Sequence, residues 1–330
     1  MKIQILETSM QNREQYDISE ICTPPVWNTS IESQPGSLQF EMLDDSKVFL
    51  RNGDIIEMKI DGKLYFKGKV FSRTKSKNRQ WKITAYDSTR YLKNEDTLVF
   101  NASSASSRFR TICQTQGIPH KILDNVNYNC AAVVEDKHTY YSMLEDALEE
   151  TRKNYKVRYG FWDNAGTLEF FNFNRMITKL VIGDNSLMTD YDYEASIDDA
   201  ANSVKVMRED KEKGKREIFV AQNAANIETW GKLQIVETVS DADLNSSQLQ
   251  QQAHVLLGEK NKETRTISID ALGNLGIRAG NSFILRISDL NRDNLGKDNL
   301  ALVKTCKHNF KDGHSMNLKV EVVAEWLENV

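Results

Sequence analysis

The chain has 330 residues, of which 40% are hydrophobic and 27% are charged, and its formal net charge at pH 7 is −4. A chain of this size is expected to form roughly two or three globular domains. The near balance of charges argues against a generally basic nucleic-acid coat and against an acidic, solvated tail.

The cysteines and the N-terminus indicate the compartment in which the chain is made. The cysteines include no CxxC pair, so the sequence indicates neither a zinc ribbon nor a disulfide scaffold. Free thiols suit synthesis in a reducing cytosol. The first residues, MKIQILETSM, lack the apolar core of a signal peptide, and no apolar run approaches the ~18 residues that span a membrane. We therefore expect cytoplasmic synthesis without membrane insertion. The cysteines are Cys22, Cys113, Cys130 and Cys306.

Short alternating runs dominate the first hundred residues. Residues 37–42 place Leu38, Phe40 and Met42 on one face, which is the period of a strand. The dipeptide Asp61-Gly62 between two such runs is a strong hairpin signal. Strands at this spacing predict an antiparallel barrel or sandwich, and we assign residues 1–100 to a first β-barrel. The other alternating runs cover 56–60, 64–71 and 80–86.

Helical spacing replaces alternation in the middle of the chain. Residues 105–116 carry apolar side chains at helical spacing, and Gly117 and Pro119 follow as stop signals. Residues 140–155 predict a second helix, and residues 159–173 alternate aromatic side chains around a turn. We expect residues 101–185 to form a small α/β domain inserted between β-rich parts.

Alternation returns in residues 186–330, which we assign to a second β-barrel. Within this part, residues 243–260 show helical spacing and predict one helix. Strands are expected around 204–206, 218–220, 264–272, 282–287, 300–308 and 317–323.

A ten-residue pattern occurs twice in the chain. Residues 51–60 (RNGDIIEMKI) and 278–287 (RAGNSFILRI) share the pattern R-x-G-[DN]-x-Φ-x-Φ-[KR]-I, where Φ is apolar. An alternating strand precedes each copy, and a hairpin with a polar tip and a closing strand follow it. Two unrelated hairpin sets are the simpler alternative, but the matched flanks favour a duplicated barrel. The aligned residues, candidates for repeat and assembly positions, are Arg51, Gly53, Asp54, Arg278, Gly280 and Asn281.

The duplication has a consequence for assembly. Two similar barrels give one chain two quasi-equivalent surfaces, so three chains would form a ring of six similar units. We predict that Arg51 and Arg278 lie at equivalent points of the two barrels.

Residues that typically carry chemistry form no catalytic motif in this sequence. The nucleotide-binding patterns GxGxxG and GxxxxGK[ST] and the hydrolase pattern GxSxG are absent. His308 and His314 flank a hairpin tip with Asp312, where a metal site is the alternative to a solvated turn, which we favour. A run of carboxylates fits a solvated strand face better than a glycosidase pair. That run contains Asp190, Asp192, Glu194, Asp198 and Asp199. We therefore assign no catalytic, cofactor or metal site.

Residues 51–93 are basic and contain interleaved aromatic side chains, which is compatible with a nucleic-acid surface. The acidic composition of the first fifty residues makes contacts between subunits of a ring, or plain solvation, the favoured interpretation. The basic residues are Arg51, Lys59, Lys63, Lys67, Lys69, Arg73, Lys75, Lys77, Arg79, Lys82, Arg90 and Lys93. The acidic residues of the first fifty are Glu7, Glu14, Asp17, Glu20, Glu32, Glu41, Asp44 and Asp45.

Several segments resemble one family. Residues 85–97 (AYDSTRYLKNEDT) resemble a signature of the PBSX-type (XkdQ-like) phage tail hub proteins. The later motifs follow in the family's order over nearly the whole chain, and the middle domain contributes none. These motifs are WGKLQ at 230–234, EKNKETR at 259–265, IRAGN at 277–281 and HNFKDGHSM at 308–316.

The resemblance implies a structural protein of contractile phage tails and phage-tail-like bacteriocins. It implies a homotrimeric baseplate hub in which two tube-like barrels per chain create a pseudo-sixfold face. That face would match the hexameric tail tube, and the threefold face would receive the trimeric central spike. Baseplate wedge and tape-measure proteins are the further implied partners. The family implies no catalytic residues, no cofactor and no specific nucleic acid, and assembly in the bacterial cytoplasm into a released particle.

Two other functions remain open at the level of the sequence. One is a cell-wall hydrolase of a phage tail, a glycosidase or peptidase, which requires a pocket with converging carboxylates or a His–Cys pair. The other is a nucleic-acid-binding β-barrel that uses residues 51–93, which requires salt-dependent binding to DNA.

Overall fold

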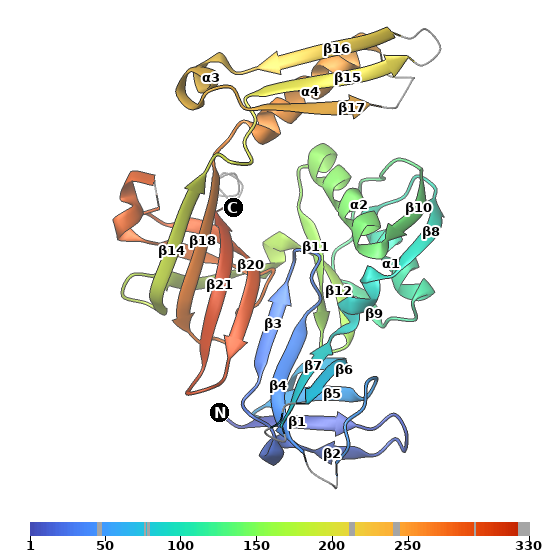
Figure 1. Cartoon of the computed structure of the whole chain (residues 1–330), viewed down its shortest axis with the longest axis vertical. Coiled ribbons are helices and arrows are strands. Elements are labelled where there is room, and N and C mark those ends of the chain that lie inside the picture. The colour runs from blue at the N-terminus through green and yellow to red at the C-terminus, as the bar shows by residue number, and fades with distance from the viewer. Residues whose placement is uncertain are drawn as a thin grey trace. The chain divides into compact units, whose positions relative to one another are not determined.

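The computed structural model describes residues 1–44, 48–75, 77, 80–210, 215–239, 245–293 and 295–322. Its architecture is mainly β with antiparallel sheets, and an α+β region occupies the middle of the chain (Figure 1). The fold class that the sequence predicts, mainly β with an α+β insertion, is therefore confirmed.

Strands and tight turns fill the first part of the chain, because apolar side chains alternate there. Leu38, Phe40 and Met42 are at most 3% exposed and point into one core. Asp61 and Gly62 have φ of +48° and +82°, which a tight hairpin turn requires. The elements are β1 (Ile3–Thr8), β2 (Gln15–Asp17), η1 (Ser19–Ile21), β3 (Val26–Ser30), β4 (Ser37–Leu43), β5 (Ile55–Ile60), β6 (Lys63–Lys75) and β7 (Gln80–Tyr86).

The α+β region surrounds one hydrophobic core that includes Phe109, Tyr140 and Phe170. Its two helices begin where the sequence predicts, because Ser104 and Thr139 cap their first backbone N–H groups. The elements are η2 (Ser88–Lys93), β8 (Glu95–Phe100), α1 (Ala105–Thr115), β9 (His120–Ile122), β10 (Val133–Thr139), α2 (Tyr140–Tyr155), β11 (Tyr159–Asn164), β12 (Thr167–Asn172) and η3 (Phe173–Met176).

The C-terminal part returns to strands with the same alternation. Ile267, Ile269 and Ala271 are at most 2% exposed on one face of their strand. The elements are β13 (Ile177–Gly183), β14 (Met188–Ser196), β18 (Thr264–Leu272), β19 (Ser282–Arg286), η4 (Ser288–Asp293), β20 (Asn299–Asn309) and β21 (Ser315–Val322).

One sheet joins the first and last parts of the chain. Its strand order is β14-β18-β21-β20-β3-β4-β7-β6-β5-β1-β2, with β19 also paired to β20 and β13 to β19. Strands β20 and β3 pair from Thr305 opposite Ser30 to Asn309 opposite Val26. In the described part of the chain this order does not return on itself. The described strands therefore form two joined open halves and do not close a hydrogen-bonded barrel within one chain.

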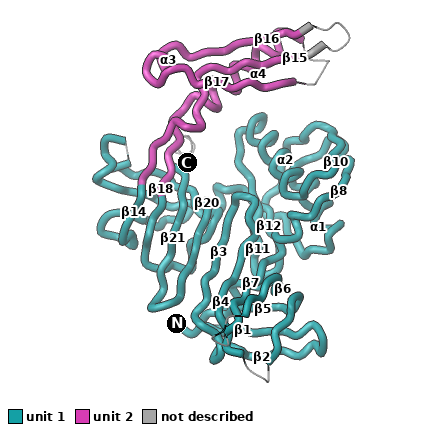
Figure 2. The backbone as a smooth tube through the Cα atoms, viewed as in Figure 1, with its two compact units in different colours: residues 1–192, 268–330 teal, residues 193–267 magenta. Residues whose placement is uncertain are grey.

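Residues 193–267, assigned from the sequence to the second barrel, form a compact unit of their own (Figure 2). A three-stranded sheet in the order β16-β15-β17 packs against α4 through Val204, Val206, Leu249 and Ala253. The expected helix begins at Ser246, and residues 240–244 lie outside the described residues. The elements are β15 (Ser203–Asp210), β16 (Lys215–Gln222), α3 (Ala224–Trp230), β17 (Gln234–Val239) and α4 (Ser246–Lys260).

The other compact unit contains residues 1–192 and 268–330. The boundaries predicted from the sequence, 1–100, 101–185 and 186–330, stay predictions. None of the described helices is both long and apolar enough to cross a membrane.

Close backbone approach within the first half leads to a stability prediction. A Cβ atom on Gly68 of β6 would lie 2.2 Å from the carbonyl oxygen of Tyr86. We expect Gly68→Ala to lower the free energy of unfolding by about 1–3 kcal/mol, because the strands must separate to admit the methyl group. Urea unfolding measures this change.

The control is Gly258→Ala in α4, where a Cβ atom would meet nothing within 4 Å. This substitution is expected to be neutral or to stabilise by up to about 1 kcal/mol, as alanine does in helices. Equal effects of the two substitutions would contradict the explanation.

Candidate assembly site

The two arginines of the repeat begin two turns with nearly the same geometry. In each turn the first carbonyl accepts a hydrogen bond from the fourth residue, at 3.2 Å from Asp54 N to Arg51 O and at 3.1 Å from Asn281 N to Arg278 O. The fourth side chain accepts a hydrogen bond from the first backbone N–H, at 2.6 Å and 3.0 Å respectively. The third residue is a glycine with φ of +94° in one turn and +97° in the other. That region of φ favours glycine because it has no Cβ.

Each turn attaches to the middle of a long strand by two backbone hydrogen bonds. In the first half, Gly53 N donates to Val70 O at 2.8 Å, and Val70 N donates to Asp54 O at 2.9 Å. The aligned glycine and asparagine of the second turn exchange the same two bonds with Val303, both at 2.9 Å. The local backbone geometry of the two aligned segments is therefore the same.

A break in strand register follows both attachment points. The β6–β7 pairing shifts between Val70 and Ser72, and the β20–β21 pairing shifts between Val303 and Thr305. Such a bulge bends a strand and increases its twist, so its place in a sheet matters for curvature. Turn, strand and bulge follow one plan in both halves. Duplication, and a role of these residues in assembly, stay predictions.

The difference between Asp54 and Asn281 follows from what each side chain contacts beyond its turn. The second oxygen of Asp54 accepts a hydrogen bond from Met10 N at 2.8 Å. At the aligned position, the Asn281 amide donates to Met176 O at 3.3 Å. A carboxylate can only accept from a backbone N–H, whereas an amide can also donate to a carbonyl. Each half therefore has the residue that its neighbouring segment requires.

A second buried carboxyl lies near the first turn. Glu7 on β1 is 2% exposed. Burial, and to a lesser extent the negative charge of Asp54, raise the pKa of Glu7 from 4.5 to about 7. No charge pair of this kind exists at the second turn, because Asn281 is neutral.

The two arginines of the repeat have different surroundings. The Arg51 guanidinium lies 5.2 Å from the ring of exposed Phe49. The Arg278 guanidinium lies between two indole rings, 4.4 Å from that of Trp162 and 5.7 Å from that of Trp27. It also donates a hydrogen bond to Asp163 O at 2.7 Å. The same backbone turn thus presents one arginine at the surface and inserts the other between three parts of the fold.

Two buried carboxyl groups lie in the electrostatic range of Arg278. Asp87 and Asp163 are 5% and 4% exposed. Burial raises the pKa of both groups, the negative charge of Asp163 raises the pKa of Asp87 further, and the positive charge of Arg278 lowers both. Arg278 is therefore a cation that stabilises the charged form of both buried carboxyl groups.

The histidines that flank the β20–β21 hairpin are not on a solvated turn, contrary to the favoured expectation for His308. His308 is fully buried and stacks on Trp27 at 5.1 Å. Its Nε2–H donates to Ile277 O at 2.8 Å, and its Nδ1 lies 3.0 Å from Nε2 of His314. Burial lowers the pKa of His308 to about 4, so the ring is neutral near pH 7. Within the described residues, no group of three His, Cys, Asp or Glu side chains is arranged to hold a metal ion.

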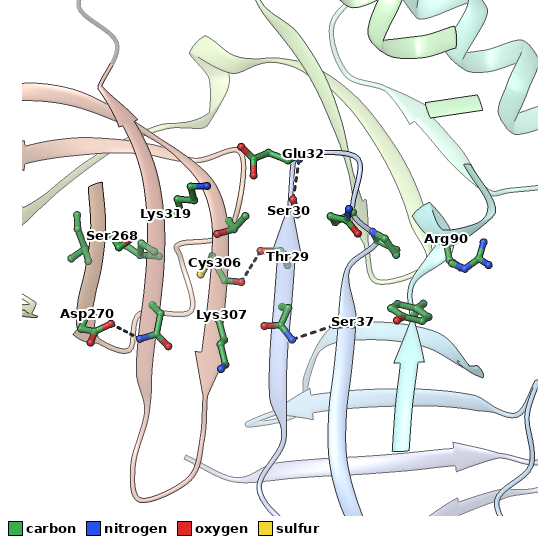
Figure 3. Close-up of a pocket in the computed structure, with 18 of the residues that line it drawn as sticks. Thr29, Ser30, Glu32, Ser37, Arg90, Ser268, Asp270, Cys306, Lys307 and Lys319 are labelled. Carbon is green, nitrogen blue, oxygen red and sulfur yellow. Dashed lines mark hydrogen bonds between the residues drawn. The ribbon is translucent and has the colours of Figure 1, made fainter. Parts of the chain in front are cut away.

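A polar groove of about 680 Å³ lies over the join between β20 and β3 (Figure 3). Asn28 donates to Ser37 at 3.2 Å across this surface. Its lining carboxylates, Glu32 beyond β3 and Asp270 on β18, are separated by β20 and β21. Three strand spacings place those backbones about 14 Å apart. A glycosidase pair requires about 5–10 Å, so these two described carboxylates do not have that geometry.

The basic residues of 51–93 are partly engaged within the chain. Lys67 pairs with Glu57 at 2.9 Å, and Lys75 pairs with Asp44 at 2.6 Å. Arg73 lies about 5 Å from the Phe49 ring. The carboxylates predicted to form a solvated face are exposed, those of β14 included. Asp45 and Arg79, which belong to the two charged sets, lie outside the described residues.

Sequence reasoning missed the residues that surround Arg278. Trp27, Trp162 and Asp87 come from β3, β11 and the end of β7. Nothing in their sequence spacing relates them to one another. The available signal is the two tryptophans. They lie outside the repeated segments, and side chains of this size tend to be buried.

The fold is that of phage tail proteins. The crystal structure of the prophage MuSo2 43 kDa tail protein from Shewanella oneidensis superposes with a TM-score of 0.68 and 13% sequence identity. The superposition covers 96% of this chain and 98% of that protein.

Sequence comparison places the chain in one family. The YQBQ-like family profile matches residues 26–321, so the chain belongs to the YQBQ-like family. It is 30% identical to the uncharacterized protein YqbQ of Bacillus subtilis, over 81% of each chain. It is 29% identical to the phage-like element PBSX protein XkdQ of the same organism, over 84% of each chain. The chain thus has the fold of phage tail proteins and belongs to the YQBQ-like family.

Substitution of the two repeat arginines is expected to have unequal effects. Arg278→Met leaves two buried carboxyls without their cation, and we expect a loss of about 3 kcal/mol in the free energy of unfolding. Arg51→Met is the matched control, because it changes the same turn position at the surface, and a loss below about 1 kcal/mol is expected. Guanidinium unfolding of both variants measures the difference, and equal losses would refute the assignment of Arg278 to the interior.

The raised pKa of Glu7 predicts a pH dependence of stability. The folded protein holds this proton more strongly than the unfolded chain, so the contribution is complete below pH 4.5 and is lost as the pH rises through about 7. Glu7→Gln should remove this decline and unfold at higher urea concentration than the parent at pH 8. Glu41→Gln, at an exposed position of β4, is the control. A parent-like pH profile of Glu7→Gln would contradict the prediction.

Proposed function

We propose that this protein is the structural baseplate hub of a contractile tail. In this proposal it forms a homotrimer with pseudo-sixfold symmetry, which adapts the hexameric tail tube to the trimeric central spike. It acts mechanically and not as an enzyme. Membership of the YQBQ-like family and the fold of a phage tail protein support a tail component in general.

The observation that carries the proposal is the repeated turn with its bulge. An adapter between a sixfold and a threefold partner needs two similar surfaces in each of three subunits. The aligned hydrogen bonds at Val70 and Val303 give the two halves one backbone plan. The pairing of β20 with β3 sets these halves side by side in one sheet. Arg51, Gly53, Asp54, Arg278, Gly280 and Asn281 are then positions that fix the geometry of each half.

The proposed partners follow from the same role. They are the tail tube protein, the central spike protein, the baseplate wedge and the tape-measure protein, with assembly in the bacterial cytoplasm and release in the particle. The open strand order of one chain supports partners in general, because exposed strand edges are stabilised by pairing.

Sedimentation and negative-stain imaging of the purified chain test the proposal. We expect a particle with three times the mass of one chain, a threefold outline, six lobes and a central hole. Monomers under all conditions, or lysis of peptidoglycan by the purified chain, would contradict the proposal.

A further inference from the structure

Beyond its bulge, β6 has one side with which none of the other described strands pairs. Strand β5 pairs with β6 only as far as Lys69, and the first repeated turn then bonds to Val70. Strand β7 follows the other side of β6 to Lys75. Among the described strands, none pairs with Ser72–Lys75 on the side opposite β7. Successive residues of a strand direct their backbone N–H and C=O groups to alternate sides, so two of these four residues can offer both groups to a further strand on that side.

The aligned side of β20 is covered. Strand β19 pairs with β20 as far as Leu302, and the second repeated turn bonds to Val303. Beyond the bulge, β3 pairs with β20 from Thr305 to Asn309. The two long strands thus share turn, attachment and bulge, and they differ in that β20 has a following strand and β6 has none among those described.

The repeat identifies which strand is equivalent to β3. The joined sheet contains the order β14-β18-β21-β20 followed by β3-β4-β7-β6. Since β20 is aligned with β6, β21 with β7 and β18 with β4, the strand aligned with β3 is β14. Strand β14 begins the sheet order, and none of the other described strands pairs with its outer side.

We propose that β14 of one copy pairs with Ser72–Lys75 of β6 in a second copy, as β3 pairs with β20 within the chain. This inference rests on the proposed trimer and names the surfaces through which it closes. Each chain then supplies eight consecutive strands, from β14 to β6. Three copies related by a threefold axis would join these strands into one continuous sheet without free edges.

Charge complementarity favours a second copy as the occupant of both edges. Asp190, Asp192 and Glu194 on β14 are exposed, whereas the last residues of β6 include Arg73 and Lys75, of which Lys75 also pairs with Asp44 of the same chain. Opposite charges on adjacent strands stabilise their pairing and select the register. Charges on an edge strand also prevent unwanted pairing, which is the alternative explanation. Two copies of the same edge would repel each other, so the charges favour the heterologous pair of edges.

Disulfide trapping tests the pairing directly. A chain with Lys75→Cys in β6 and Asp192→Cys in β14, two positions that would share one face of the paired strands, should form covalent trimers under mild oxidation, visible on a non-reducing gel. The matched control has Lys63→Cys with Asp192→Cys, because Lys63 lies on the part of β6 that β5 covers. We expect no covalent trimer from this control. The parent chain controls for Cys22, which is partly exposed.

Charge reversal provides a second test. Asp192→Lys alone and Lys75→Glu alone should each weaken trimer association about tenfold in sedimentation, which corresponds to about 1.4 kcal/mol. The double variant should recover most of the loss. Asp199→Lys, at an exposed carboxylate outside β14, should change little.

The outcomes separate this inference from the proposed function. A trimer that gives no β6–β14 disulfide and ignores both charge reversals would overturn the inference and leave the hub in place. Chains that stay monomeric in both assays, with the circular dichroism of the folded parent, would overturn the proposed trimer as well.

Discussion

Strand β20 pairs with strands of both halves of the main sheet, and the joined fold depends on this shared strand. Its first residues face β19, its last residues face β3, and β21 accompanies both parts. Extended backbone in a protein interior must have its N–H and C=O groups paired, because each unpaired group costs about 1–3 kcal/mol. Separation of the halves would expose five paired positions of β20, from Thr305 to Asn309. The bulge at Lys304 lies where the partner of β20 changes from β19 to β3.

The interior near this join combines side chains from three regions. Trp27 comes from the first half, Trp162 from the α+β region and Arg278 from the second half. The faces of indole rings attract a guanidinium cation, and this attraction stabilises the charge of Arg278 where little water can solvate it. The adjacent carboxyls, Asp87 and Asp163, make this contact sensitive to charge balance, because the negative charge of Asp163 disfavours a second negative charge on buried Asp87.

The sequence predicts those helices and strands in which apolar residues recur at a regular spacing. Strand β7 and helix α2 have the predicted boundaries, because alternation or helical spacing runs through them without interruption. The repeated turns were found because a positive φ requires glycine and the returning hydrogen bond requires Asp or Asn.

Elements whose position depends on distant partners were missed. Strand β3 is five residues long, and its pairing with β20 joins parts of the chain that are nearly the whole sequence apart. Alternation indicates a strand but does not identify its neighbour. The strands of residues 193–267 likewise carry no signal that they form a compact unit of their own. The exposed position expected for His308 was wrong because the His308 ring is buried and stacks on Trp27 of β3.

Different physical demands act on the residues of the repeated turns, and they imply different rates of sequence drift. Glycine and the Asp or Asn are fixed by the backbone of each turn, so homologues should keep them in both copies. The arginines are fixed only by what surrounds them. A surface arginine beside Phe49 is free to be exchanged, whereas one between two indoles is not. If the two copies arose by duplication, their sequence similarity would therefore be lost one position at a time, and the arginine of the first copy would be the first position to change.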